Sequence, residues 1–179
     1  LITIWSRAAR VQLVRVGLTA GATRATLTPL TPPDRVIAGF DLAPGGREAV
    51  VVAQPADRSA ELERVRWGEG GSAPPERLTD VGATFLRTPA ARPHHFRVED
   101  DRGPALDAWA MLPPHAASER VPVILYCGGG PGGMRSDNFQ LEWQVFAAAG
   151  YAVVWTNTRG CQGYGDSFCT AILGSWGQA

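Results

Sequence analysis

Short runs of alternating apolar and polar residues dominate the first half of the chain. Strand-like runs occur at residues 2–5, 11–16, 36–42, 49–53 and 62–67. Runs of this length, rich in Val, Ile and Leu and separated by turns, are typical of β-strands. We therefore predict that the first half is all β. The sequence "APGGRE" between two of these runs is typical of a hairpin turn.

Two segments of this half resemble each other. "LVRV" at residues 13–16 precedes a glycine-containing turn and Leu27-Thr28, while "LERV" at residues 62–65 precedes a longer turn and Leu78-Thr79, with offsets of 49 and 51 residues. Short strands repeating at this period are typical of β-propeller blades, with chance similarity as the alternative. About one and a half to two blades fit here, whereas propellers close with roughly four to eight. We therefore expect further blades upstream.

The pattern changes after residue 93. "HHFRVED" and "ALDAWAMLPP" predict an antiparallel hairpin, and "VPVILYC" predicts a buried strand. A helical pattern follows in "NFQLEWQVFAAAG", where Gly150 supplies a stop, and "YAVVWTNTRG" predicts another buried strand. Strand, glycine loop, helix and strand together predict a βαβ unit with two parallel strands, whose functional loops lie at the carboxyl ends of the strands.

The glycine-rich loop at residues 128–133 follows the first of these buried strands. Backbone without Cβ atoms can direct peptide N–H groups at a developing negative charge, which favours an oxyanion hole. A phosphate-binding loop is the first alternative, although the G-K-[ST] ending of a P-loop and the spacing of a dinucleotide fingerprint are both missing. A turn that binds no ligand is the second alternative.

The chain resembles the prolyl oligopeptidase family of serine peptidases, in the branch of acylaminoacyl peptidases and dipeptidyl aminopeptidases. The segments that carry the resemblance are "PVILYCGGGPGG", "EWQVFAAAGYAVVWTNTRGCQGYGDSF" and the propeller-like repeat. The resemblance implies the end of a β-propeller followed by the first part of an α/β-hydrolase domain. We place the two domains at residues 1–90 and 91–179.

The resemblance also implies roles for loop residues. The family pattern H-G-G-P falls on Gly128, Gly129, Gly130 and Pro131, so glycine replaces the histidine. The backbone amides of Gly129 and Gly130 are then the candidate oxyanion donors, and Gly128 and Pro131 support the loop. In an alternative register, "CGGG" resembles the H-G-G-G loop of lipases and esterases with Cys127 in the histidine position, and it implies the same role.

Two residues of the second loop are assigned supporting roles. Arg159, in "NTRG", is expected to organise the loop through hydrogen bonds, with direct substrate contact as the alternative. Tyr164 is expected to pack as an aromatic residue, with a position lining the site as the alternative.

The nucleophile elbow G-x-S-x-G of such hydrolases does not occur in the sequence. "GDSFC" around Ser167 and "LGSWG" around Ser175 each depart from the pattern. His94, His95 and His115 precede the glycine loop, whereas the triad histidine of α/β-hydrolases follows it, so we predict surface or packing roles for them. We expect the Ser-His-Asp triad downstream and the chain to be a fragment lacking both ends. Its last buried strand should then present an unpaired hydrophobic edge.

Composition narrows the class of partner. The 17 basic residues are all arginine and balance 17 acidic ones, so a nucleic-acid partner is not expected. The apolar runs fall short of the roughly 20 residues that cross a membrane. The cysteines and histidines lack the spacing of a metal site, so neither a cofactor nor a metal is predicted. Three cysteines without a CxxC favour free thiols in the cytoplasm. An upstream signal peptide is compatible with the sequence.

The sequence thus predicts part of a serine peptidase that hydrolyses short peptides by acyl transfer. Its partners are the short peptide substrate and the rest of the same polypeptide, and an oligomer is compatible with the sequence. One alternative function is a propeller that binds partners, fused to an inactive hydrolase remnant. The other is an esterase of the α/β-hydrolase class.

Overall fold

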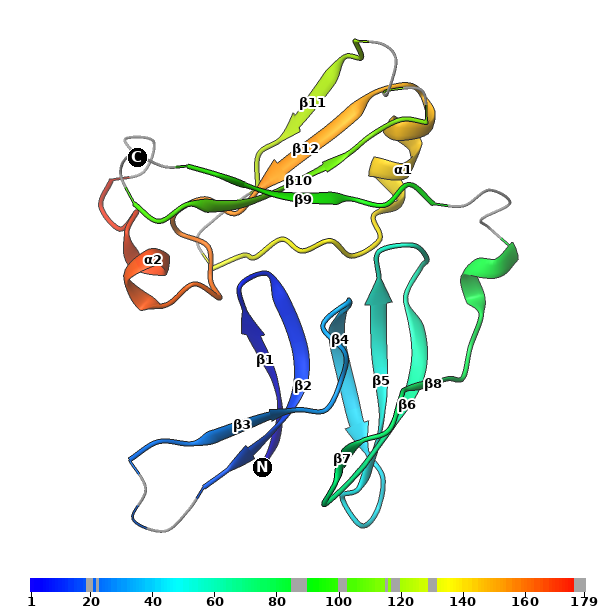
Figure 1. Ribbon diagram of the computed structural model, residues 1–179, viewed down its shortest axis with the longest axis vertical. Helices are drawn as coiled ribbons and strands as arrows, with labels where there is room; N and C mark the ends of the chain where they lie inside the picture. Colours follow the sequence, from blue (N-terminus) through cyan, green and yellow to red (C-terminus); the bar gives the residue numbers. More distant parts are fainter. Residues whose placement is uncertain are drawn as a thin grey trace.

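The computed structural model describes residues 1–18, 21, 23–84, 90–99, 103–114, 116, 120–128 and 132–175 (Figure 1). The first half forms two antiparallel sheets. The three-stranded sheet has the order β1-β2-β3, and the other has the order β4-β5-β6-β7 with β8 also pairing with β6. The strands are β1 (Ile2–Arg7), β2 (Arg10–Gly17), β3 (Thr26–Pro29), β4 (Arg35–Leu42), β5 (Glu48–Pro55), β6 (Glu61–Gly68), β7 (Gly71–Ser72) and β8 (Glu76–Arg77).

The second half forms one mixed sheet with two helices. The strand order is β11-β12-β10-β9, in which β11 and β12 are parallel and the other pairs are antiparallel. The elements are the 3₁₀ helix η1 (Val81–Thr84), β9 (His94–Val98), β10 (Leu106–Met111), β11 (Val123–Tyr126), α1 (Leu141–Ala148), β12 (Ala152–Thr156) and α2 (Asp166–Thr170). The predicted hairpin and the predicted βαβ unit are both present.

The five strand predictions of the first half are confirmed by β1, β2, β4, β5 and β6. The turn "APGGRE" joins β4 to β5, and it needs glycine because Gly45 and Gly46 have φ of 96° and 65°. The amide of Ala43 donates to the carbonyl oxygen of Glu48 at 2.9 Å, which closes this hairpin.

The internal repeat is present, but one of its residue pairs was assigned wrongly. The amide of Leu62 donates to the Thr79 hydroxyl at 2.9 Å, and Leu78 N–H donates to the Leu62 carbonyl at 2.8 Å. The same two bonds occur from Leu13 to Thr31 and from Leu30 to Leu13, at 3.0 and 2.8 Å. The partner of Leu78-Thr79 is therefore Leu30-Thr31, whereas Leu27-Thr28 lies within β3.

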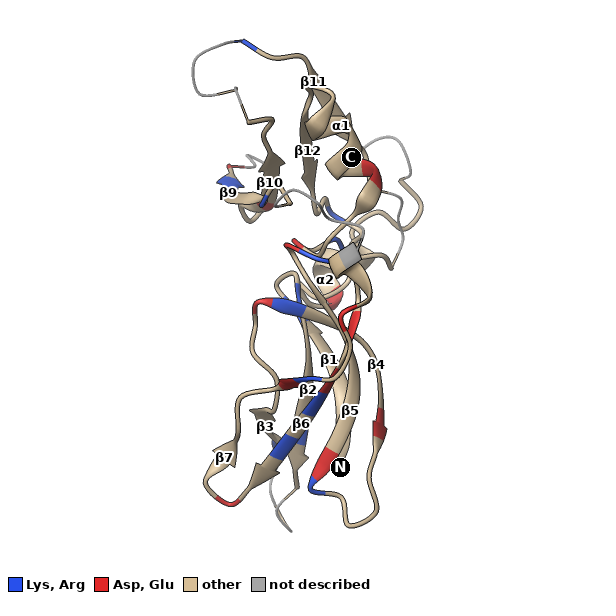
Figure 2. Ribbon diagram, turned by 90° about the vertical axis from the view of Figure 1, so that its right-hand side faces the viewer, with Lys and Arg blue, Asp and Glu red and all other residues tan. Residues whose placement is uncertain are grey.

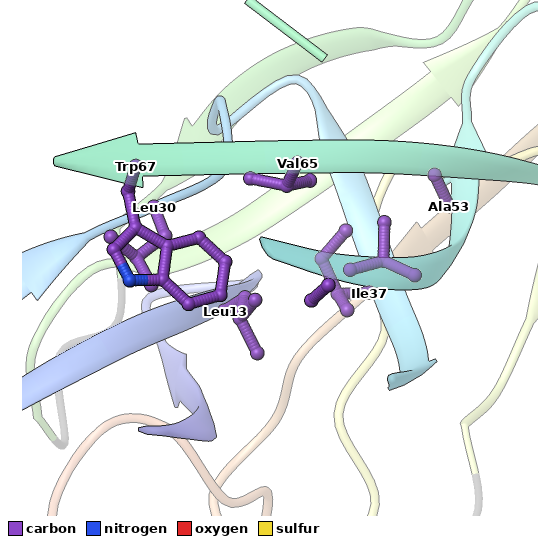
Figure 3. Packing of buried hydrophobic residues seen from close by; sticks show 8 residues of the cluster. Leu13, Leu30, Ile37, Ala53, Val65 and Trp67 are labelled. Atoms are coloured by element: carbon purple, nitrogen blue, oxygen red, sulfur yellow. The ribbon is translucent and has the colours of Figure 1, made fainter. Parts of the chain in front are cut away.

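A buried apolar cluster holds the two sheets of the first half together (Figure 3). Strand β5 alternates buried and partly buried residues along its whole length, which is the period-two pattern expected of a strand with one face in a core. The cluster consists of Leu13, Leu30, Ile37, Ala49, Val51, Ala53, Val65 and Trp67. Residues from β2 and from β4 to β6 thus share one core.

A second apolar cluster forms where α1 covers one face of the mixed sheet. Trp143 and Ala147 of α1 are buried against Trp109 of β10 and Trp155 of β12. The rings of Trp143 and Trp155 have centroids 4.1 Å apart, and Trp155 stacks on Trp109 at 6.1 Å. The helix ends at the expected stop, since Gly150 has a φ of 95° and its amide bonds to the carbonyl oxygen of Ala147.

The edge strands of the mixed sheet are β11 and β9, so the prediction that the last buried strand, β12, forms an edge was wrong. The crossover through α1 places β12 beside β11, and β10 occupies the other side of β12. Val123 and Leu125, which share one face of β11, are 62% and 63% exposed. An exposed apolar edge strand of this kind can pair with another segment.

Charged residues of both signs are interspersed on β5, β6 and β8, and Figure 2 shows basic positions along β6. Arg66 pairs with Glu48 at 2.7 Å and with Glu76 at 3.3 Å. Such exposed pairs contribute little stability but leave no single-sign patch on this face. Within the residues that the structure describes, no helix is long and apolar enough to cross a membrane.

Candidate functional site at the carboxyl ends of the parallel strands

The glycine-rich loop leaves the sheet where the two parallel strands end. Tyr126 of β11 is in register with Trp155 of β12, so the loops that follow both strands start at the same edge. Gly128 is exposed there. Gly129, Gly130 and Pro131 lie outside the described residues, so the assignment of the oxyanion amides stays a prediction.

Gly128 is not required as glycine by its surroundings. A Cβ atom placed at this position would lie 3.7 Å from both Cγ and Nε of Arg135 and 3.9 Å from the Thr156 carbonyl oxygen, which are ordinary contacts. A Cβ atom is therefore tolerated at Gly128.

Backbone hydrogen bonds join the glycine-rich loop to the loop that follows β12. The amide of Gly132 donates to the carbonyl oxygen of Gly160 at 3.1 Å, and that of Gln162 donates to Gly133 at 3.2 Å. Gly160 is required as glycine, because its φ is 96° and a Cβ atom would lie 2.4 Å from Cδ1 of Ile172. The two loops therefore form one connected unit.

The side chain of Asn157 holds the backbone of Arg135, just after the glycine-rich loop. This side chain is fully buried at the end of β12. Its Oδ1 accepts a hydrogen bond from the amide of Arg135 at 2.7 Å, and its Nδ2 donates to the carbonyl oxygen of Arg135 at 2.8 Å. A buried amide with both ends paired fixes the backbone it contacts, because leaving either group unpaired is costly.

Arg135 also contacts Tyr126, the last residue of β11, which precedes the glycine-rich loop. Its Nη2 donates to the Tyr126 hydroxyl at 3.2 Å, and its guanidinium carbon lies 4.9 Å from the centre of the Tyr126 ring. This stacking of a cation on an aromatic face is favourable. The segments that flank the glycine-rich loop are therefore joined directly by the side chains of Tyr126 and Arg135.

Tyr164 has hydrogen-bond partners in addition to the packing that was predicted for it. Its ring lies 5.0 Å from that of Phe168. Its hydroxyl donates to Oδ2 of Asp107 at 2.8 Å and accepts from Nδ2 of Asn157 at 3.0 Å. Burial is the largest cause that raises the pKa of this phenol; the bond from Asn157 lowers it, and Asp107 raises it. The phenol therefore stays neutral and donates to the carboxylate.

Asp107 connects the network to the antiparallel hairpin β9–β10. Its Oδ1 lies 2.8 Å from Nε2 of His95, and its carbonyl oxygen accepts from the Thr156 hydroxyl at 2.9 Å and from the Asn157 amide at 3.1 Å. His95 also contacts the ring of Trp109 at 5.2 Å. His95 is thus half-exposed and packs against Trp109. It also bonds to Asp107 and so joins the hydrogen-bond network.

The remaining candidate residues occupy separate places. Arg159 is partly buried in the loop after β12, and its predicted organising role stays a prediction. His94 is exposed on β9, Ser167 is exposed on α2 and Ser175 follows α2. His115 lies outside the described residues.

The three cysteines are free thiols. Cys127 is exposed, whereas Cys161 is buried, and burial raises the pKa of its thiol. In the part of the chain that the structure describes, no three His, Cys, Asp or Glu side chains are grouped so that they could hold a metal ion.

Sequence reasoning missed Asp107, Arg135 and the role of Asn157. These residues come from β10, the glycine-rich loop and the end of β12, so no local spacing links them. Asp107 and Asn157 nevertheless stand out in the sequence, because each is a polar residue at the end of an otherwise apolar strand.

These features define the class: an α/β unit with a glycine-rich loop at the carboxyl ends of its parallel strands, preceded by antiparallel sheets. Comparisons with known proteins specify it further. Residues 137–179 match the family model described as "Prolyl oligopeptidase family". The chain is 31% identical over 151 residues to the uncharacterized peptidase YuxL of Bacillus subtilis, covering 83% of this chain and 22% of that protein. It is 33% identical over 93 residues to dipeptidyl-peptidase 5 of Porphyromonas gingivalis, covering 50% of this chain and 14% of that protein.

Solved structures agree with these matches. The acylaminoacyl peptidase of Pyrococcus horikoshii superposes with a TM-score of 0.76 at 28% identity, covering 96% of this chain and 26% of that one. An acylaminoacyl peptidase in complex with Z-Gly-Gly-Phe-chloromethyl ketone gives a TM-score of 0.76 at 29% identity, covering 96% and 25%. The chain belongs to the prolyl oligopeptidase family, which confirms the resemblance, and it spans about a quarter or less of the length of these relatives.

Proposed function

We propose that the chain is part of a serine peptidase that hydrolyses short peptides by acyl transfer through a Ser-His-Asp triad located in downstream polypeptide. The relatives named as peptidases support this proposal. The observation that carries it is the anchoring of the glycine-rich loop: buried Asn157 holds the backbone of Arg135, and Arg135 holds Tyr126. A loop fixed at both ends can stabilise a developing charge with little reorganisation, which is the requirement for an oxyanion hole.

In this proposal the amides of Gly129 and Gly130 bind the oxyanion. Gly128 and Pro131 shape the loop, and Arg159 organises its neighbour. Tyr164 supports the loop indirectly, because its hydroxyl bonds to Asn157, the residue that clamps Arg135. No residue described by the structure is proposed as the nucleophile.

We also propose that residues 1–90 are the last blades of a β-propeller and that residues 91–179 begin an α/β-hydrolase domain. The repeated Leu-Thr contacts and the antiparallel order β4-β5-β6 with β8 support the first part. Two contacts support the boundary. The amides of Val81 and Gly82 bond to Glu61 of the first part, at 3.0 Å each, whereas Ala91 exchanges two hydrogen bonds with the Gln144 side chain of α1, at 2.8 and 2.9 Å.

The rest of the polypeptide is proposed as the partner of the exposed apolar strand edge. Val123 and Leu125 of β11 and Val145 of α1 are more than half exposed, so further segments should cover them. Short peptides are the proposed substrates. A cytoplasmic location is proposed because all three cysteines are free thiols.

The test is labelling of the complete polypeptide with a fluorophosphonate, which reacts only with an activated serine. The account predicts stoichiometric labelling that is lost on heat denaturation, together with faster turnover of acyl-peptides than of simple esters. Turnover of esters alone would indicate an esterase, and a native protein without labelling would indicate a binding module that has lost catalysis.

A further inference from the structure

The turn between β1 and β2 has an unusual backbone. Ala8 and Ala9 have φ of 47° and 61°, in the left-handed region that alanine rarely adopts. Two consecutive residues with positive φ form the tight turn that matches the twist of a two-stranded hairpin, and Asn-Gly or Gly-Gly usually occupies it. Alanine at both positions is unfavourable unless surrounding contacts over-determine the conformation.

Those contacts come from the second half of the chain. In Figure 1 the β1–β2 turn points toward the segments that follow β11 and β12. The amide of Ala8 donates to the carbonyl oxygen of Gly163 at 2.9 Å. The carbonyl oxygen of Ala9 accepts from the buried Ser136 hydroxyl at 2.6 Å, and the Ala9 methyl group is buried with Trp109 and Trp155.

The two contacted segments are the loops of the candidate site. Ser136 directly follows Arg135, and its own carbonyl oxygen accepts from the indole N–H of Trp155 at 3.2 Å. Gly163 lies in the second loop with a φ of 88°, and a Cβ atom there would lie 2.4 Å from the Met134 sulfur. The Ala8–Ala9 turn, Met134 and Gly163 are therefore close neighbours, with no free space for a Cβ atom at Gly163.

We propose that Ser136 is a positioning residue for the proposed peptidase reaction: it binds the Ala8–Ala9 turn and thereby holds the glycine-rich loop in register with the loop after β12. The N-terminal hairpin thus acts on the site without touching substrate. This inference rests on the proposed function. It adds that the antiparallel sheets of the first half help to position the loops of the site.

The test compares two buried hydroxyls in the complete enzyme. Ser136→Ala removes the bond to Ala9, and Ser136→Thr retains a hydroxyl. Thr31→Val is the matched control, because Thr31 is also buried and its hydroxyl accepts one hydrogen bond from the amide of Leu13, within the first half of the chain. Thermal unfolding, kcat and KM for an acyl-peptide, and hydrogen exchange of the amides of Gly132, Arg135 and Gln162 are measured for each.

The proposal predicts that Ser136→Ala lowers kcat by roughly fivefold with KM nearly unchanged and raises exchange at those amides by a similar factor, as expected for the loss of one hydrogen bond. Ser136→Thr should restore most of kcat and most of the protection from exchange. Thr31→Val should lower the melting temperature without altering kcat or the exchange of those amides. If Ser136→Ala behaves like Thr31→Val, the residue is only structural and the proposal is overturned. Hydrogen exchange decides this even if the polypeptide shows no peptidase activity, which would count against the proposed function alone.

Discussion

Arg135 Nη2 donates a hydrogen bond to the Tyr126 hydroxyl at 3.2 Å, so a residue just after the glycine-rich loop is bonded to a residue just before it. The loop is thereby closed at its base. Asn157 reinforces the closure from below by holding both backbone groups of Arg135.

Replacing Arg135 by Met is the first test of the closed loop. The substitution keeps much of the apolar stem but loses the hydrogen bond and the stacking on Tyr126, so we expect kcat for an acyl-peptide to fall by about tenfold, on the scale of one to two such contacts. Arg135→Lys should recover only part of the loss, because lysine keeps the charge but lacks the planar group. Steady-state kinetics of the two variants decide this, and equal kcat in wild type and Arg135→Met would count against a role for the closure.

The raised pKa of Tyr164 predicts that the stability of the protein falls at alkaline pH. Its folded-state pKa is raised, chiefly by burial, so the stability that the neutral phenol contributes is fully present below the ordinary tyrosine pKa of about 10 and is lost as the pH rises above it. Tyr164→Phe should lower stability at pH 7 by about 1 kcal/mol, because Asp107 and Asn157 lose a partner. It should also flatten the alkaline decline.

Denaturant unfolding at a series of pH values measures both effects. Tyr151→Phe is the control, because it removes a hydroxyl from a tyrosine that is 40% exposed. Parallel profiles for wild type and Tyr164→Phe above pH 10 would show that the Tyr164 phenol is not the group responsible.

The lowered pKa of Glu61 predicts that the stability of the protein falls at acid pH. Burial alone would raise the pKa of this carboxyl, but hydrogen bonds from the Thr79 hydroxyl and the amides of Gly82 and Val81 lower it below 4.5. A lowered folded-state pKa stabilises the fold above the unfolded value, and this stability is lost as the pH falls through the folded-state pKa. Glu61→Gln should therefore be less stable at pH 7, by about 1 to 3 kcal/mol, yet less sensitive to acid.

The matched control for Glu61 is Glu76→Gln, since Glu76 is half-exposed and makes surface ion pairs. Chemical unfolding between neutral pH and pH 3 measures the difference. An acid dependence that is identical in wild type and Glu61→Gln would contradict the assigned cause and the anchoring of the segment after β8.

The strands and the βαβ unit could be predicted because their apolar periodicity is local. The repeat was placed correctly at Leu13 and Leu62 but wrongly at its second half, since both Leu27-Thr28 and Leu30-Thr31 fit the letters. Which threonine bonds to the leucine amide depends on where the chain returns after the turn. The edge strand was misplaced for a similar reason, because strand order is set by the hairpin β9–β10 as well as by the crossover.

The candidate site was predictable only in its location. The glycine-rich loop after a buried strand indicated the carboxyl edge of the sheet, and the structure places Gly128 there. The supporting network depends on Asp107, Arg135 and Asn157, which meet only after three separate segments have folded. No spacing rule connects them, and the turn at Ala8 and Ala9 reaches the same loops from the far end of the chain.

The most direct test of the central claim uses paired substitutions at the two proposed oxyanion donors. Gly129→Ala and Gly130→Ala keep the backbone N–H, whereas Gly129→Pro and Gly130→Pro remove it. In the complete enzyme, the account predicts that at least one proline variant loses roughly 10²- to 10³-fold in kcat for an acyl-peptide while its alanine partner loses far less. Proline variants at both positions that retain kcat within about twofold of their alanine partners would contradict it, because a single donor of this kind is worth far more than that factor.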